Sequence, residues 1–214
     1  MKHTWKGAVG ATAGVLAITG GLVAGAILPA SAAPAFNEAY ATQAFGIINS
    51  APTAVAQFPG SSPVTLPFSV IPGLLATGPI EDQADGVSAS SVITGVLATK
   101  LGKMDLTALG VGAGCSLGDG VASGGTEIIG GKIAGIHGRP IMLPVDPPPN
   151  TQIRVPDGLV LTLNRQFTID GGTVLIVQAI HASMLGGAET LILGAAGCNN
   201  SNLTPTPTPT NTNG

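Results

Sequence analysis

The sequence predicts an all-β fold: a β-sandwich-like domain of two sheets, built from about ten short antiparallel strands. Charged residues are only 9% of the 214 residues, while glycine contributes 32 and proline 17. That composition excludes coiled coils, long-helix bundles and charged disordered chains. Residues 159–170 alternate between apolar and polar side chains, as half-buried strands do. After Ala33, no window of about 12 residues keeps a helical apolar stripe.

Residues 1–32 have the pattern of a signal peptide. Lys2 and Lys6 precede an apolar stretch over residues 7–28, and small residues lead up to Ala32 and Ala33. Signal peptidase requires small residues before the cleaved bond, so we expect cleavage after Ala32, with cleavage after Ala33 as second choice. The apolar run is also long enough to span a bilayer, so an uncleaved anchor is the alternative. After cleavage we expect no stable membrane span. The absence of a twin arginine favours the general secretory route.

We expect residues 33–200 to form the β-sandwich-like domain. Its first half contains runs of β-branched and apolar residues that predict strands at 40–48, 64–71, 87–97, 104–114, 126–136 and 140–143. His137-Gly138 is the expected hairpin turn, with Gly130-Gly131 as a competing turn or a bulge. Residues 77–81 and 147–149 are expected to be loops because of their glycine and proline content.

The second half has the clearest strand pattern. Four runs, at 151–155, 159–170, 173–185 and 189–198, are separated by turn residues at 156–158, 170–172 and 186–187. This order predicts a four-stranded antiparallel meander.

Residues 201–214 differ from the domain before them. They repeat Thr-Pro, carry no charge and include one apolar side chain, Leu203. We expect an extended, disordered spacer that cannot bury a core, of the kind that often carries O-linked sugars. No sorting motif, apolar helix or basic segment follows in this sequence, so we expect either a released protein or an anchor missing from this version of the chain.

Two cysteines, Cys115 and Cys198, remain after the expected cleavage. In an exported chain, such a pair is first expected to form a disulfide. The loop of about 84 residues would contribute roughly 4–5 kcal/mol by chain entropy. A metal site would need more cysteine or histidine ligands nearby, and a nucleophilic cysteine would need an adjacent base. Neither requirement is met around these two residues.

Charge and histidine content argue against several ligands. Eight basic residues against eleven acidic ones argue against nucleic-acid binding, and we expect no cofactor. Glu81, Asp82 and Asp85 are a weak candidate for a calcium site, although a solvated loop explains the same cluster. His137 is expected in a turn and His181 in the middle of a strand.

An enzyme hypothesis depends on Ser116, which sits in a Gly-x-Ser-x-Gly motif at residues 114–118. Asp170 and His181 follow it in the order of a hydrolase triad. However, the glycine-rich residues after Ser116 cannot begin the helix that such a motif requires, and Cys115 is expected to be in the disulfide. We therefore expect no catalysis.

Several short segments match the pattern of one family, most specifically over the last 50 residues of the match. They are 44–46, 86–92, Cys115, 147–153, 161–166, 177–182 and 194–198. On these segments the chain resembles the choice-of-anchor P family of exported actinobacterial proteins. Arg165 and Gln178 depart from that pattern, in which Glu and Asn are commoner.

The resemblance implies an envelope-exposed protein with no assigned catalytic activity. We therefore expect a secreted or cell-surface β-domain with a structural or adhesive role. An exported protein that binds a small ligand or calcium is the alternative, and a serine hydrolase using Ser116 is the third. The binding partner is not indicated, with components of the cell envelope as one option.

Overall fold

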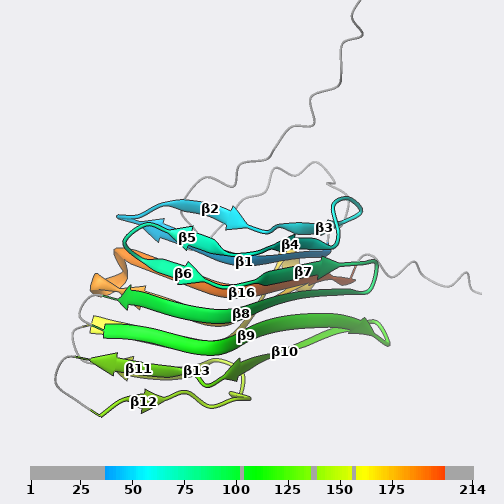
Figure 1. Cartoon of the computed structure of the whole chain (residues 1–214). Helices are drawn as coiled ribbons and strands as arrows, with labels where there is room; N and C mark the ends of the chain where they lie inside the picture. The colour runs from blue at the N-terminus through cyan, green and yellow to red at the C-terminus, as the bar shows by residue number, and fades with distance from the viewer. Residues whose placement is uncertain (1–36, 102–103, 136–138, 156–157, 201–214) are drawn as a thin grey trace, which may run out of the picture.

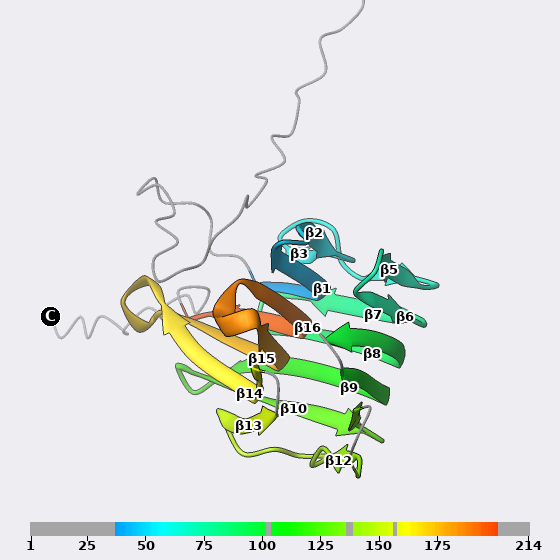
Figure 2. The same cartoon turned by 90° about the vertical axis from the view of Figure 1, so that its left-hand side faces the viewer.

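The structure, a computed structural model, describes residues 37–101, 104–135, 139–155 and 158–200. These residues form two antiparallel sheets that lie face to face, and no α-helix occurs among them. Figure 1 and Figure 2 show the two layers, with the yellow-to-red strands in one and the green strands in the other. The predicted all-β, two-sheet fold is confirmed.

The first sheet has seven strands in the order β13-β14-β15-β16-β1-β2, with β3 also paired to β1. Their bounds are β1 (Asn37–Gly46), β2 (Ser50–Thr53), β3 (Ala56–Phe58), β13 (Thr151–Val155), β14 (Leu159–Ile169), β15 (Val174–Met184) and β16 (Glu189–Asn199). The first and last described strands, β1 and β16, both belong to this sheet and are neighbours. In that pair Tyr40 lies opposite Ala195.

The second sheet has nine strands, with β12-β11-β9-β8-β6-β5 as its main path. β10 pairs with β9, and β7 pairs with both β8 and β4. The bounds are β4 (Val64–Leu66), β5 (Ser69–Ile71), β6 (Leu75–Thr77), β7 (Ile80–Ala84), β8 (Ser88–Leu101), β9 (Met104–Gly118), β10 (Val121–Ile129), β11 (Lys132–Gly135) and β12 (Ile141–Met142).

The core lies between the sheets and consists mainly of aliphatic and small side chains. Inward and outward residues alternate along most of β9, for example, and Leu161, Leu191, Leu193 and Ile93 are fully buried in the core. Alanines such as Ala182 fill much of the remainder. Since such small residues bury little apolar area each, a covalent link between the layers contributes a larger share of stability.

A line of irregular residues crosses the first sheet and changes which side chains face outward. Asn164 on β14 and Gly194 on β16 have left-handed backbone conformations, with φ of 48° and 65°, and both are skipped in the strand register. The inward face therefore passes from Leu163 before the irregularity to Gln166 after it, and Gln166 donates to the Gly124 carbonyl of the opposite sheet. As a result Arg165 faces outward.

The predicted meander is confirmed as β13 to β16, with short 3₁₀ turns at Asp170–Gly172 and Leu185–Gly187. The loop expected at residues 77–81 is wrong, because β6 ends at Thr77 and β7 begins at Ile80. The single strands expected at 64–71 and 126–136 are each two strands, the second divided at Gly130, which has φ of 61°. Three-residue strands carry too little periodicity to be recognised, which is why about ten strands were expected.

Several predicted features lie outside the described residues. They are the signal peptide with its cleavage sites at Ala32 and Ala33, the turn at His137-Gly138, Pro156-Asp157 and the Thr-Pro segment 201–214. Within the described ranges, no helix combines the length and the hydropathy needed to cross a membrane.

Candidate functional site

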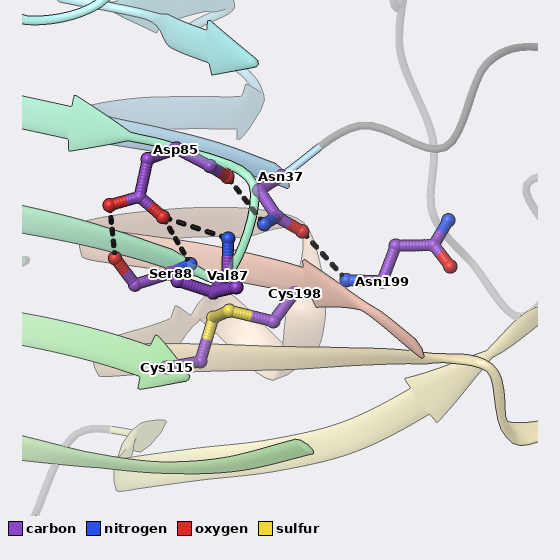
Figure 3. Close-up of a disulfide and its surroundings, with 7 residues drawn as sticks. All are labelled: Asn37, Asp85, Val87, Ser88, Cys115, Cys198 and Asn199. Carbon is purple, nitrogen blue, oxygen red and sulfur yellow. Dashed lines mark hydrogen bonds between the residues drawn. A yellow bond between two sulfur atoms is a disulfide. The ribbon is translucent and has the colours of Figure 1, made fainter. Parts of the chain in front are cut away.

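A disulfide joins the two sheets at one end of the sandwich. Cys115 on β9 and Cys198 on β16 are both buried, their Cα atoms are 5.9 Å apart, and they are 83 residues apart in sequence. This confirms the predicted pairing, and Figure 3 shows it crossing from one layer to the other. The bond fixes the last described strand to the opposite sheet just before residue 201, where the Thr-Pro segment begins.

A buried asparagine reinforces the same end. The Asn37 side chain donates to the Asp85 carbonyl at 2.6 Å and accepts from the Asn199 backbone amide at 2.9 Å (Figure 3). Asn37 is fully buried, and its two hydrogen bonds connect the start of β1 to the turn after β7 and to the end of β16. The amide group suits this position because it can donate and accept at once.

The predicted calcium cluster is not assembled. Glu81 and Asp82 are successive residues of β7, so Glu81 points outward and Asp82 points into the core. The Asp85 carboxylate accepts from the Val87 and Ser88 amides and from the Ser88 hydroxyl, which closes the β7–β8 turn and lowers the pKa of Asp85. Among the described residues, no three His, Cys, Asp or Glu side chains are arranged to hold a metal.

Asp82 is an isolated carboxyl group in the core. It is fully buried, and burial raises its pKa to about 7, although Ser91 and the Val92 amide counteract part of that rise. Neither carboxylate oxygen makes a hydrogen bond of normal geometry to the described residues. The group is therefore a source of pH-dependent stability.

Ser116 lies on the outer face of the second sheet, in a shallow hollow of about 430 Å³. The hollow exists because Gly114 and Gly125 provide no side chains there, while Ser88 and Ser123 line its rim. Ser116 is followed by the β9–β10 turn and not by a helix, so the strand-to-helix geometry of the hydrolase motif is missing.

The other two residues of the hypothetical triad are elsewhere. His181 lies on the outer face of the first sheet, since its neighbours Ile180 and Ala182 point into the core. Asp170 is exposed in the turn between β14 and β15. Ser116 and His181 thus face opposite sides of the sandwich, and the structure does not bring them together.

A row of polar side chains crosses the outer face of the first sheet. The register places Tyr40, Ala195, Gln178 and Arg165 side by side on four neighbouring strands. Arg165 Nη1 donates to Gln178 Oε1 at 3.2 Å, and the guanidinium carbon lies 4.8 Å from the centroid of the Phe167 ring. We call these residues, with Phe167, the Arg165 row.

Electrostatic effects link the Arg165 row to its neighbours. Burial, followed by the charge of Glu38, raises the pKa of Tyr40, while Gln178 and Arg165 act against that rise. Burial, followed by the charge of Arg165, lowers the pKa of His181 to about 4, so its imidazole is neutral at pH 7. Gln57 donates to the Glu38 carboxylate at 2.8 Å.

Sequence reasoning singled out Arg165 and Gln178 only as departures from a family pattern. Their contact could not be inferred, because the irregularity at Asn164 sets which residues of β14 face outward. Asp82 was noticed only as part of an acidic cluster. Comparisons with known proteins give no match, whether to a protein-family model, a curated protein or a solved structure.

Proposed function

We propose that this chain is an exported, noncatalytic β-domain that is secreted or displayed at the cell surface, where it has a structural or adhesive role. The observation that carries the proposal is the Cys115–Cys198 disulfide. Stable disulfides form in oxidising compartments outside the cytosol, and this one joins the two layers of a domain with a small-residue core.

The sequence supports the same proposal independently. The apolar stretch at residues 7–28, followed by small residues up to Ala32, has the order of a cleavable signal peptide. The Thr-Pro repeat after Ser201 has the composition of an extended spacer. We infer that the chain is related to the choice-of-anchor P family on the segments given above.

Fractionation of cells that produce the full chain tests this proposal. We expect the protein in the medium or the envelope fraction, shortened to begin at Ala33 or Pro34. A control chain lacking residues 2–28 should stay in the cytosol with reduced cysteines. Full-length chain beginning at Met1 in the cytosolic fraction would contradict the proposal.

A further inference from the structure

We propose that the outer face of the seven-stranded sheet binds an acidic polysaccharide, with Arg165 holding a sugar carboxylate. The inference rests on the proposed adhesive role and names the class of molecule that the domain would hold. It is built on the Arg165 row and its uncharged polar neighbours.

Arg165 is held in a defined position. Its guanidinium group is fixed by the bond from Nη1 to Gln178 Oε1 and by its contact with the Phe167 ring. Gln178 itself is buried, with 4% of its surface exposed, so the acceptor does not move freely. A guanidinium that is already oriented loses less entropy when it binds an anion.

Hydrogen bonds to the described residues use little of the donor capacity of Arg165. Its guanidinium group carries five N–H donors, and the structure assigns one nitrogen, Nη1, to Gln178. Burial lowers the pKa of Arg165 and Tyr40 acts against that change, and no carboxylate contributes to either effect. Glu38 belongs to β1, three strands away across the sheet, which corresponds to about 14 Å. A ligand carboxylate can therefore pair with Arg165 without approaching a fixed negative charge on its own strand or the next.

The surroundings of Arg165 favour a saccharide over an acidic peptide. The adjacent row consists of Gln152, Thr162 and His181, which lie opposite one another on β13, β14 and β15. All three are uncharged at pH 7, and each can donate or accept a hydrogen bond. Arg154 is exposed on the same face, two residues from Gln152, and this uncharged row separates it from Arg165. Sugar hydroxyl groups between spaced carboxylates match this arrangement better than the contiguous carboxylates of an acidic peptide.

Binding of the purified domain to polygalacturonate, a chain of sugars that each carry a carboxylate, tests the proposal. We expect saturable binding that weakens with added salt, no binding to neutral dextran, and at least about tenfold weaker binding to polyglutamate. Absence of polygalacturonate binding, or equal binding of polyglutamate, would overturn the proposal. Since purified protein is used, either result leaves the export proposal untouched.

Two variants locate the binding. Arg165→Gln should reduce affinity about tenfold or more, because a charged hydrogen bond is lost, while Arg139→Gln, at an exposed position just before β12 of the other sheet, should change it less than about twofold. Gln178→Glu should also abolish binding, because it places a carboxylate against Arg165 while the fold and the arginine remain. Its melting curve verifies folding. Wild-type affinity in a folded Gln178→Glu protein, or equal losses in both arginine variants, would refute the assignment.

Discussion

Asp82 and Ser91 lie directly opposite each other on β7 and β8, and both are fully buried. Within the part of the chain that the structure describes, neither the hydroxyl group of Ser91 nor the carboxylate oxygens of Asp82 make a hydrogen bond of normal geometry. Burial outweighs the effect of Ser91 and the Val92 amide on this carboxyl group and favours its neutral form, so ionising it weakens the folded state.

Asp82→Asn should stabilise the protein at alkaline pH. The folded pKa of about 7 lies above the ordinary aspartate value of 3.8, so stability from the protonated carboxyl is lost as pH rises between these two values. At pH 8 we expect a gain of about 2–4 kcal/mol, and at pH 4 a much smaller one. Thermal unfolding at both pH values measures the effect. Glu81→Gln, on the exposed face of the same strand, is the control, and a gain equal at both pH values would refute the explanation.

His181 should make stability change with pH in the opposite direction to Asp82. Its folded pKa of about 4 lies below the ordinary histidine value of 6.5, so the stability that it contributes above pH 6.5 is lost as pH falls towards 4. His181→Gln should remove this loss, and Arg165→Gln should reduce it, because Arg165 is the second cause of the lowered pKa. Denaturant titrations between pH 4 and 7 test both variants. An unchanged acid-side slope in His181→Gln would show that other groups dominate.

Two adjacent glycines of β10 should respond very differently to a methyl group. At Gly124 a Cβ would lie 2.5 Å from Val177 Cγ2 and 2.8 Å from the Gly114 carbonyl oxygen, whereas at Gly125 nothing lies within 4 Å. Gly124→Ala should cost about 1–3 kcal/mol through overpacking. Gly125→Ala should change stability by less than about 0.5 kcal/mol. The free energy of unfolding of each variant measures the difference. Equal losses in the two variants would contradict the packing of β10 against β15.

The sequence predicted the regular parts of this fold better than its edges. The meander was recognisable because β14 alternates clearly, β15 and β16 are apolar runs of the same length, eleven residues, and turn residues separate all four strands. β6 and β7 were missed because strands of three to five residues on either side of Gly78-Pro79 resemble a loop. The disulfide followed from the number of cysteines alone. The Arg165 row could not be predicted, because the irregularity at Asn164 determines the outward face of β14 and leaves no periodic signal.

Loss of the disulfide should destabilise the domain strongly. Cys198→Ser removes a link across 83 residues of sequence, which corresponds to about 4–5 kcal/mol in the chain-entropy description. Cys115→Ser and Cys198→Ser should lower the melting temperature equally. The double variant should lower it no further than either single variant, since the same one bond is lost in each case. Additive losses in the double variant would mean that the cysteines act separately.

The most direct test of the account is the intact mass of the protein recovered from outside the cell, measured before and after reduction. We predict a chain that begins at Ala33 or Pro34, has no thiol that reacts with an alkylating reagent in the native state, and gains the mass of two hydrogen atoms on reduction. Two alkylated cysteines in the native protein, together with an intact Met1, would contradict an exported domain whose sheets are joined by Cys115 and Cys198.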